Sequence, residues 1–385
     1  MKVIAFHLPQ YHEIPENDEW WGKGFTEWVN VKDGKVYHEG QYQPREPLNE
    51  NYYNLLDINT LKWQAALARK YGIYGFCFYH YWFNGHMLLE KPVELFKSLG
   101  AHEKIPYCIC WANENWTKAW ADKTNEILIE QKYGNHEEWI DHFNYLLQFF
   151  MDPMYIKENN KPLLVIYRPE LIYNLKKMLL CWEEMAKKNG FDGISFSYQQ
   201  YSYLVNHGKE EKLFSHNIEY QPAYTIAKKR IECMNFKDKI YYYAPNFVRN
   251  VYTQLKSNMK GNHPKDLLKT MKTGSVYDYD EIWSRIITSQ PTTPKSIPGA
   301  FIDFDNTPRR KENGTYFRNV TVEKFKSYFK KQLIHARNDY SSDYLFFFAW
   351  NEWGECAYLE PDKLRRYSVL EAIYDSLVET KELEQ

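Results

Sequence analysis

Short apolar runs recur along the chain, and each ends in polar or aromatic residues. The first two are KVIAFHLPQYH (2–12) and YGFCFYHYWF (74–83). Most of these runs are continuously apolar rather than alternating, which is typical of parallel strands buried on both faces. The predicted strands cover residues 2–12, 74–83, 105–116, 161–170, 192–200, 218–224, 299–309 and 344–353.

Segments with helical spacing separate most of the predicted strands. They cover residues 60–71, 91–99, 137–150, 171–189 and 364–379. Eight strands that alternate with helices predict an α/β fold, a (β/α)8 TIM barrel formed by residues 1–385 as one catalytic domain. An open doubly wound sheet would need a glycine-rich phosphate loop after its first strand, and LPQYHEIPEND stands there instead.

Two regions depart from this alternation. Residues 13–58 are polar and aromatic without periodicity, and we expect a long loop over the C-terminal face of the barrel. Residues 225–298 separate the sixth and seventh strands, and we expect an inserted loop or small subdomain there.

Charge and aromatic content narrow the class of partner. Lys plus Arg number 49 and Asp plus Glu 50, so no global field favours nucleic acid or an anionic membrane. Aromatic residues make up 18% of the chain, with 13 Trp and 33 Tyr. Their flat apolar faces with polar handles suit stacking on sugars. An oligosaccharide or polysaccharide is therefore the expected partner, although an aromatic-rich core would give the same composition. The oligomeric state is left open.

The chain carries no sign of secretion or membrane insertion. Its N-terminus lacks the apolar core and cleavage site of a leader peptide, and no apolar run approaches the roughly 18 residues of a membrane helix. We expect a cytoplasmic protein, with its six cysteines reduced.

Polar and aromatic residues gather at the ends of nearly all predicted strands. In a parallel barrel the C-terminal strand ends line one face, where active sites lie. Any one of these residues has a structural explanation: His80 fits a hydrogen-bonded core histidine, and Asn113 fits a turn. Their accumulation at most strand ends nevertheless predicts a binding site. The candidates are His7, Gln10, Tyr79, His80, Trp82, Trp111, Asn113, Glu114, Tyr167, Gln199, Asp303, Asp305, Arg309, Asn351, Glu352, Trp353 and Glu355.

Glu352 and Glu355 are the candidate catalytic pair. They follow the last strand three residues apart, so a helical turn would place both on one side. Trp350 and Trp353 would give apolar surface that raises the pKa of one carboxyl. Metal-ligand spacings and the fingerprints of nucleotide and cofactor sites are absent, so we expect neither metal nor cofactor. The remaining chemistry is acid–base work on glycosidic bonds.

Four blocks of sequence resemble the WbsX-like family, whose members are often found among O-antigen genes and labelled glycosyltransferases. They are FHLPQYHEIPENDEWWGKGFTEWVNV, YGFCFYHYWFNG, CWANENWTKAW and AWNEWGECAYLEPD, and they extend from residue 4 to 362. The first block adds Glu27 and Trp28 to the candidate binding residues. That family is in turn similar to glycoside hydrolase family 99, the endo-α-mannosidases.

The resemblance to family 99 implies a (β/α)8 barrel and retention of anomeric configuration. Its Trp-Asn-Glu-Trp-x-Glu motif matches 350–355 in this chain. By that match Glu352 would deprotonate the 2-hydroxyl of the sugar, which attacks C1 to form a 1,2-anhydro sugar. Glu355 would protonate the leaving oxygen and later activate water. This route favours α-manno- or α-L-rhamno-configured glycosides.

Two residues depart from the family pattern. Relatives usually carry Gly where this chain has Cys356, and a left-handed backbone there would cost a cysteine about 1 kcal/mol. Gly354 stands where family 99 commonly has His, so we expect contacts to the leaving group to differ.

Three functional classes remain open. The first is a retaining glycoside hydrolase, and the second a glycosyltransferase in lipopolysaccharide O-antigen or capsular polysaccharide biosynthesis. The third is a non-catalytic glycan-binding protein, which would have no need of both glutamates. For the second class, DFD at 303–305 only superficially matches a metal-binding D-x-D motif.

Overall fold

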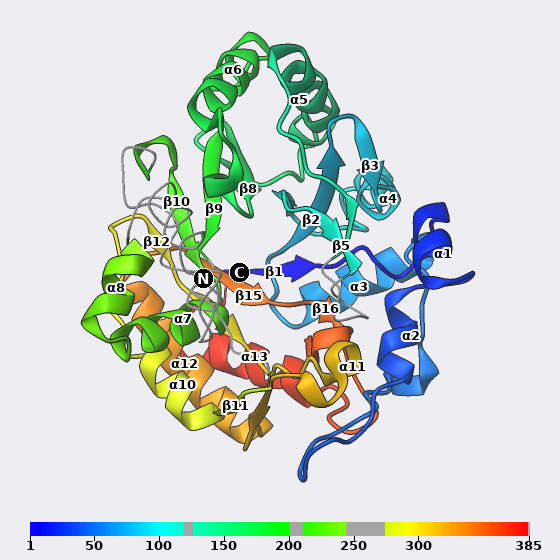
Figure 1. The fold of residues 1–385 in the computed structure, drawn as a ribbon, viewed down its shortest axis with the longest axis vertical. Coiled ribbons are helices and arrows are strands. Elements are labelled where there is room, and N and C mark those ends of the chain that lie inside the picture. Colours follow the sequence, from blue (N-terminus) through cyan, green and yellow to red (C-terminus); the bar gives the residue numbers. More distant parts are fainter. Residues whose placement is uncertain (119–125, 201–210, 244–273, 384–385) are drawn as a thin grey trace, which may run out of the picture.

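A computed structural model describes residues 1–118, 126–200, 211–243 and 274–383. It confirms the predicted (β/α)8 barrel, seen in Figure 1 with helices surrounding the strands. All strand pairings along the barrel path are parallel, in the order β12-β10-β9-β8-β4-β2-β1-β15-β13. The strands are β1 (Lys2–His7), β2 (Gly75–Phe83), β4 (Tyr107–Trp111), β8 (Lys161–Ile166), β9 (Ser195–Gln200), β10 (His216–Glu219), β12 (Ser296–Ile297), β13 (Gly299–Phe301) and β15 (Tyr344–Phe348).

The seventh strand position is shared by β12 and β13, which only Pro298 separates. β12 pairs with β10 and β13 pairs with β15, so this broken strand joins the two ends of the sheet. A Cβ on Gly299 would lie 2.1 Å from the carbonyl oxygen of Glu219, so glycine allows the two backbones to approach. The eight predicted strands therefore occupy eight positions around the barrel.

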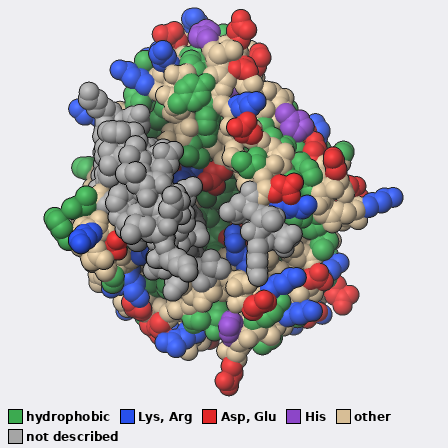
Figure 2. Space-filling view, viewed as in Figure 1, with side chains coloured by type: hydrophobic (Ala, Val, Ile, Leu, Met, Phe, Trp, Pro, Cys, Tyr) green, Lys and Arg blue, Asp and Glu red, His purple; other side chains and the backbone are tan. Residues whose placement is uncertain are grey.

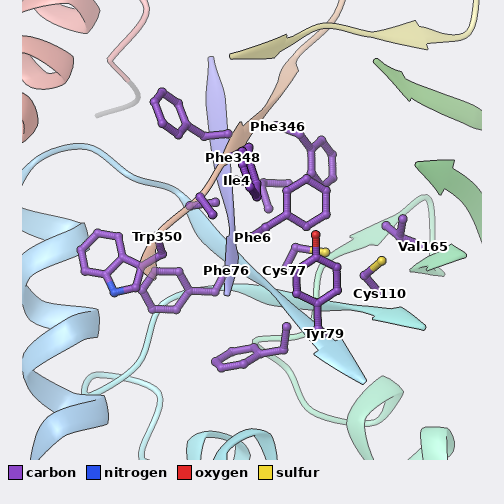
Figure 3. Close-up of a cluster of buried hydrophobic side chains, with 14 of the residues drawn as sticks. Ile4, Phe6, Phe76, Cys77, Tyr79, Cys110, Val165, Phe346, Phe348 and Trp350 are labelled. Atoms are coloured by element: carbon purple, nitrogen blue, oxygen red, sulfur yellow. The ribbon is translucent and has the colours of Figure 1, made fainter. Parts of the chain in front are cut away.

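The alternation of side chains along each strand decides what fills the barrel. Ile4 and Phe6 of β1 lie in one cluster with Cys77, Cys110 and Val165 from neighbouring strands (Figure 3). The next residue, His7, points to the other side and meets Gln64 of α3 (Ile58–Lys70). One strand thus contributes alternately to the barrel interior and to its contact with the helices.

Helices that follow the strands cover the outside of the barrel (Figure 1). The predicted helical segments are confirmed as α3, α4 (Lys91–Ser98), α5 (His136–Phe150), α6 (Leu175–Lys188) and α13 (Ser368–Glu379). α12 (Val322–Asn338) precedes β15 and packs against α13. No helix among the described residues is both long enough and apolar enough to cross a membrane.

The long loop expected over 13–58 contains two short helices, α1 (Pro15–Trp21) and α2 (Glu27–Lys32). Each is too short for a hydrophobic period to be visible, so the sequence pattern did not reveal them. Pro15 at the first position of α1 is the remaining local signal of a helix start.

The expected insertion at 225–298 lies partly outside the described residues. Its described part holds most of α7 (Ala223–Glu232), together with α8 (Phe236–Tyr243), β11 (Val276–Asp278) and α10 (Tyr279–Ile286). α10 packs against both α7 and α12. This segment therefore contributes to the helix layer.

Candidate active site

One guanidinium joins three carboxylates at the C-terminal ends of the strands. Arg309, on α11 (Thr307–Arg310), donates from Nη1 to Glu355 Oε1 (2.8 Å) and from Nη2 to Glu352 Oε2 (3.1 Å). Its Nε donates to Glu27 Oε1 at 2.7 Å. The structure thus brings together the predicted pair and two further predicted residues. Figure 2 shows this face of the molecule hollowed near its middle, with acidic and basic side chains at the hollow.

The two candidate catalytic carboxylates differ in exposure. The side chain of Glu352 is 9% exposed and that of Glu355 is 25% exposed. Burial raises the pKa of Glu352 to about 8, Arg309 opposes that rise, and the charges of Glu355 and Glu27 add to it. Burial also raises the pKa of Glu27, against the influence of Arg309. The site therefore binds a proton more tightly than isolated carboxylates do.

The carboxylates are carried by a short turn after β15. β16 (Asn351–Glu352) leads into a 3-10 turn at Trp353–Glu355, and β17 (Ala357–Tyr358) pairs back with β16. The turn places Glu352 and Glu355 on one side, as their spacing predicts. The structure closes the turn with Cys356 in the left-handed region, at φ 54° and ψ 18°.

Tyrosines, rather than the expected indoles, lie around Glu352. Burial raises the pKa of Tyr81, and the charge of Glu352 raises it further. The hydroxyls of Tyr79 and Tyr220 lie 3.5 Å apart, and each has a pKa raised mainly by burial and also by Glu352. Tyr79 points into the barrel beside Phe6 (Figure 3). Hydroxyls on rigid rings are suited to hydrogen-bonding a sugar.

Tyr81 and Tyr220 were not among the residues predicted from the sequence. Tyr81 lies two residues after Tyr79 on β2, so both side chains point to the same face of the strand. The alternation of side chains along β2 could therefore have identified Tyr81. Tyr220 directly follows β10. A strict period of two on β2 would have selected Tyr79 and Tyr81 and set aside His80 and Trp82.

Four predicted site residues face the surrounding helices instead. His7 Nε2 lies 3.1 Å from Gln64 Oε1 of α3. His80 Nε2 lies 3.0 Å from His142 Nε2 of α5, and Trp82 stacks on the same imidazole. Trp111 packs edge-on against His142. Burial lowers the pKa of His7 and of His80 to about 3, so both rings are neutral packing groups at physiological pH.

The side chains of Trp28 and Trp353, the first residue of the turn, pack against each other in the protein interior. Their indole rings contact each other, with 5.5 Å between centroids, and they are 5% and 1% exposed. Trp353 Nε1 donates to Glu360 Oε2 at 2.7 Å, and Trp28 Nε1 donates to the carbonyl of Tyr53 at 2.8 Å. Trp350 is also buried and contacts Phe76. All three rings belong to the buried hydrophobic core.

Glu360 is a supporting residue that the sequence did not indicate. It accepts hydrogen bonds from Tyr53, Gln64 and Trp353 at 2.7–2.8 Å. Burial raises its pKa to about 7, although these donors oppose the rise. A buried carboxyl with three donors fixes the position of the indole above it.

Two asparagines hold neighbouring strand ends together. Asn351 Oδ1 accepts from the amide of Leu8 (2.7 Å), and its Nδ2 donates to the Leu8 carbonyl (3.0 Å). Asn113 makes the same pair of bonds with Arg168, each at 2.7 Å. Their amide groups are therefore committed to the backbone.

The remaining predicted residues occupy other positions around the same end of the barrel. Glu114 pairs with Arg168 at 2.5 Å on the rim, and the half-buried Tyr167 follows β8. Gln199 lies within hydrogen-bonding distance of Cys110, with 3.6 Å between Oε1 and Sγ, on the barrel-interior side of β9. Gln10 is buried, and its carbonyl accepts from the amide of Glu27 at 3.0 Å.

Asp303 and Asp305 bond to residues of the loops at this end of the barrel. Asp303 pairs with Arg45 (2.8 Å) and Arg365 (2.7 Å). The side chain of Asp305 accepts from Gln43 at 3.0 Å, and its amide donates to the carbonyl of Glu355 at 2.8 Å. Asp305 therefore bonds through its backbone to the turn that carries Glu352 and Glu355.

A parallel barrel with a carboxylate pair at the C-terminal strand ends is an architecture of carbohydrate-active enzymes. The chain belongs to the family described as Glycosyltransferase WbsX, whose family model matches residues 3–373. It is 30% identical over 378 residues to the uncharacterized protein WxcX of Xanthomonas campestris pv. campestris (strain B100). That match covers 97% of this chain and 49% of the relative, so the chain spans about half the length of the curated relatives it matches.

Three solved structures have a similar fold. The GH99 endo-alpha-mannosidase from Bacteroides thetaiotaomicron matches with a TM-score of 0.54 at 12% identity, over 99% of this chain and 98% of that chain. The same enzyme in complex with bis-tris-propane gives a TM-score of 0.56 at 12% identity, with the same coverage. A glycoside hydrolase-like protein matches with a TM-score of 0.51 at 11% identity, over 97% of this chain and 93% of that chain.

Proposed function

We propose that this chain is a retaining glycoside hydrolase that acts on α-manno- or α-L-rhamno-configured glycosides, with Glu352 and Glu355 as its catalytic pair. The observation that carries the proposal is that both carboxylates come from one turn at the C-terminal end of the barrel and share Arg309. The family-99 motif at 350–355 supplies the assignment of roles.

In the first step Glu352 takes the proton of the sugar 2-hydroxyl. The oxygen O2 attacks C1 as the bond from C1 to the leaving oxygen breaks, and Glu355 gives its proton to that oxygen. The product is a 1,2-anhydro sugar. The geometry needs O2 trans to the leaving group, which explains the proposed sugar configurations.

In the second step Glu355 takes a proton from water. The water oxygen attacks C1, the bond from C1 to O2 breaks, and O2 recovers its proton from Glu352. Two inversions at C1 restore the original configuration. Tyr79, Tyr81 and Tyr220 would bind sugar hydroxyls beside the pair.

The raised pKa of Glu352 bears on its role as base. With a pKa of about 8, this carboxyl is mostly protonated in the free protein at neutral pH. A base must be ionised, so the proposal requires that turnover increase as Glu352 loses its proton. The alternative assignment, with Glu352 as the acid, would give the opposite pH dependence.

The test compares wild type with Glu352→Gln and Glu355→Gln on α-mannan and α-rhamnan oligosaccharides, followed by NMR of the released anomer. Each substitution should reduce kcat by roughly 10²–10⁴-fold, and wild type should release the retained anomer first. Glu184→Gln, on an exposed face of α6, is the matched control. Equal turnover by Glu355→Gln and wild type would remove the acid role from Glu355.

A glycosyltransferase is the second candidate, because the family to which the chain belongs is described by that activity. Calorimetry with UDP-, GDP- and dTDP-sugars in the presence of Mn²⁺ separates the two. Tight nucleotide-sugar binding, with transfer to an acceptor and no release of free sugar, would favour the transferase.

A further inference from the structure

Each of the three nitrogens of the Arg309 guanidinium donates to a carboxylate, and the three carboxylates come from different elements. Glu27 comes from the first turn of α2, Glu352 from β16 and Glu355 from the 3-10 turn. Arg309 Nε donates to Glu27 Oε1 at 2.7 Å. Because the guanidinium is planar, fixing Nε also fixes the directions of Nη1 and Nη2. Glu27 therefore controls where Arg309 meets the candidate catalytic pair.

Glu27 cannot contact a substrate, because it is completely buried at 0% exposure. Its Oε1 accepts from Arg309 and, at 3.4 Å, from Asn30. Its Oε2 has no hydrogen-bond partner among the described residues. A buried carboxylate with so few donors depends on its ion pair. The pair with Arg309 is thus the main interaction that this side chain makes.

Gly354 lies between the two catalytic candidates and directly against this pair. A Cβ at Gly354 would lie 1.8 Å from Glu27 Oε1 and 2.7 Å from Arg309 Nε. The φ angle of Gly354 is not in the left-handed region, so backbone torsion does not demand glycine there. Glycine is needed there because the Glu27–Arg309 pair occupies the space that a Cβ would fill.

We propose that Glu27 is a positioning residue that holds Arg309 between Glu352 and Glu355, and that position 354 is glycine to make room for this pair. The inference rests on the proposed function for its link to catalysis. Its structural part, the coupling of Glu27, Arg309 and Gly354, stands on the contacts alone.

The first test is a titration that needs no substrate. Protein labelled with ¹³C at glutamate carboxyls is titrated by NMR, with Glu352→Gln used to assign the Glu352 signal. Glu27→Gln keeps the size of the side chain and an acceptor for Arg309 Nε, but removes a negative charge. The midpoint of Glu352 should then move down by about one pH unit. An unmoved midpoint would show that Glu27 is not coupled to the Arg309–Glu352 pair and would overturn the proposal, and a shift would establish the coupling that the next test links to the position of Arg309.

The second test is a double-mutant cycle. Gly354→Ala should reduce kcat on the glycan cleaved by wild type at least about ten-fold with little change in KM, because Glu27 does not contact substrate. In a Glu27→Ala background the same substitution should cost less than about two-fold, since the carboxylate at 1.8 Å is gone and Arg309, no longer held by Glu27, can move away from the added Cβ. An equal loss in both backgrounds would contradict the proposal. Near-ultraviolet circular dichroism verifies folding, and the isosteric Glu27→Gln serves if Gly354→Ala does not fold.

The two proposals can fail separately. If Glu352→Gln and Glu355→Gln keep full turnover, the proposed catalytic pair is wrong, while the titration still tests whether Glu27 is coupled to the Arg309–Glu352 pair. If Glu352 and Glu355 are confirmed as the catalytic pair but the titration midpoint of Glu352 is unchanged by Glu27→Gln, only the positioning role of Glu27 is contradicted.

Discussion

The side-chain amide of Asn351 bonds both the N–H and the carbonyl of Leu8, a residue 343 positions earlier in the chain. This contact joins the end of the last strand to the end of the first and sets the starting point of the turn that carries Glu352. Asn113 and Arg168 repeat the arrangement between β4 and β8. Each of the two asparagines therefore links two neighbouring strand ends through side-chain hydrogen bonds to the backbone.

Asn351→Ala should lower the free energy of unfolding by about 3 kcal/mol, because it leaves the buried N–H and carbonyl of Leu8 without partners. It should also reduce kcat, since Glu352 adjoins it. Asn113→Ala is the matched control, with a similar loss of stability and a smaller loss of kcat. Urea denaturation and kinetics measure both quantities. Equal kcat losses would show that Asn351 has no special influence on the turn.

The pH dependence of kcat/KM tests the role of Glu352. As the base it must be ionised, so kcat/KM should fall as pH decreases through about 8. In Glu352→Asp this fall in kcat/KM should disappear or occur at a different pH, because the shorter side chain changes the position and surroundings of the carboxyl. A decline as pH increases through the same value would assign Glu352 the acid role instead.

Glu219 offers a stability test outside the active site. Burial raises its pKa from 4.5 to about 7, although Tyr340 donates to it at 2.7 Å. The folded protein then binds this proton more tightly than the unfolded chain, so stability is lost as pH rises from about 4.5 through 7.

Glu219→Gln cannot ionise and should avoid this loss. We subtract the free energy of unfolding of wild type from that of Glu219→Gln at each pH. This difference should be larger at pH 8.5 than at pH 5, by on the order of 1–3 kcal/mol. Urea denaturation at both pH values measures the difference, with Glu184→Gln as the exposed control. Parallel pH profiles for wild type and Glu219→Gln would contradict a raised pKa.

The left-handed backbone at Cys356 predicts an unusual order of stability among its variants. At φ 54° a Cβ is unfavourable, so Cys356→Gly should be more stable than Cys356→Ala by about 1 kcal/mol. Both variants lose the buried thiol, which accepts from Gln43 Nε2 at 3.1 Å, and the comparison cancels that shared loss. Thermal unfolding of the two variants measures the difference. If Ala is the more stable, backbone torsion does not decide the stability of variants at this position.

The order of strands and helices was readable from the sequence because each depends on local patterns. Eight apolar runs separated by helical spacing defined the barrel, and the one rival topology lacked its phosphate loop. The close spacing of Glu352 and Glu355 was likewise local, and the 3-10 turn places them on one side. Their catalytic role remains a prediction.

Partners distant in the chain were decided only by the tertiary structure. Arg309 and Glu27 are 282 positions apart, and no local pattern links them. Burial, too, is a property of the whole fold, and it directed His80 and Trp82 toward α5 while placing tyrosines near Glu352. The sequence by itself determined which residues could reach the C-terminal end of the barrel. Closure of the barrel determined which of them meet, because only then do strand ends far apart in the chain become neighbours.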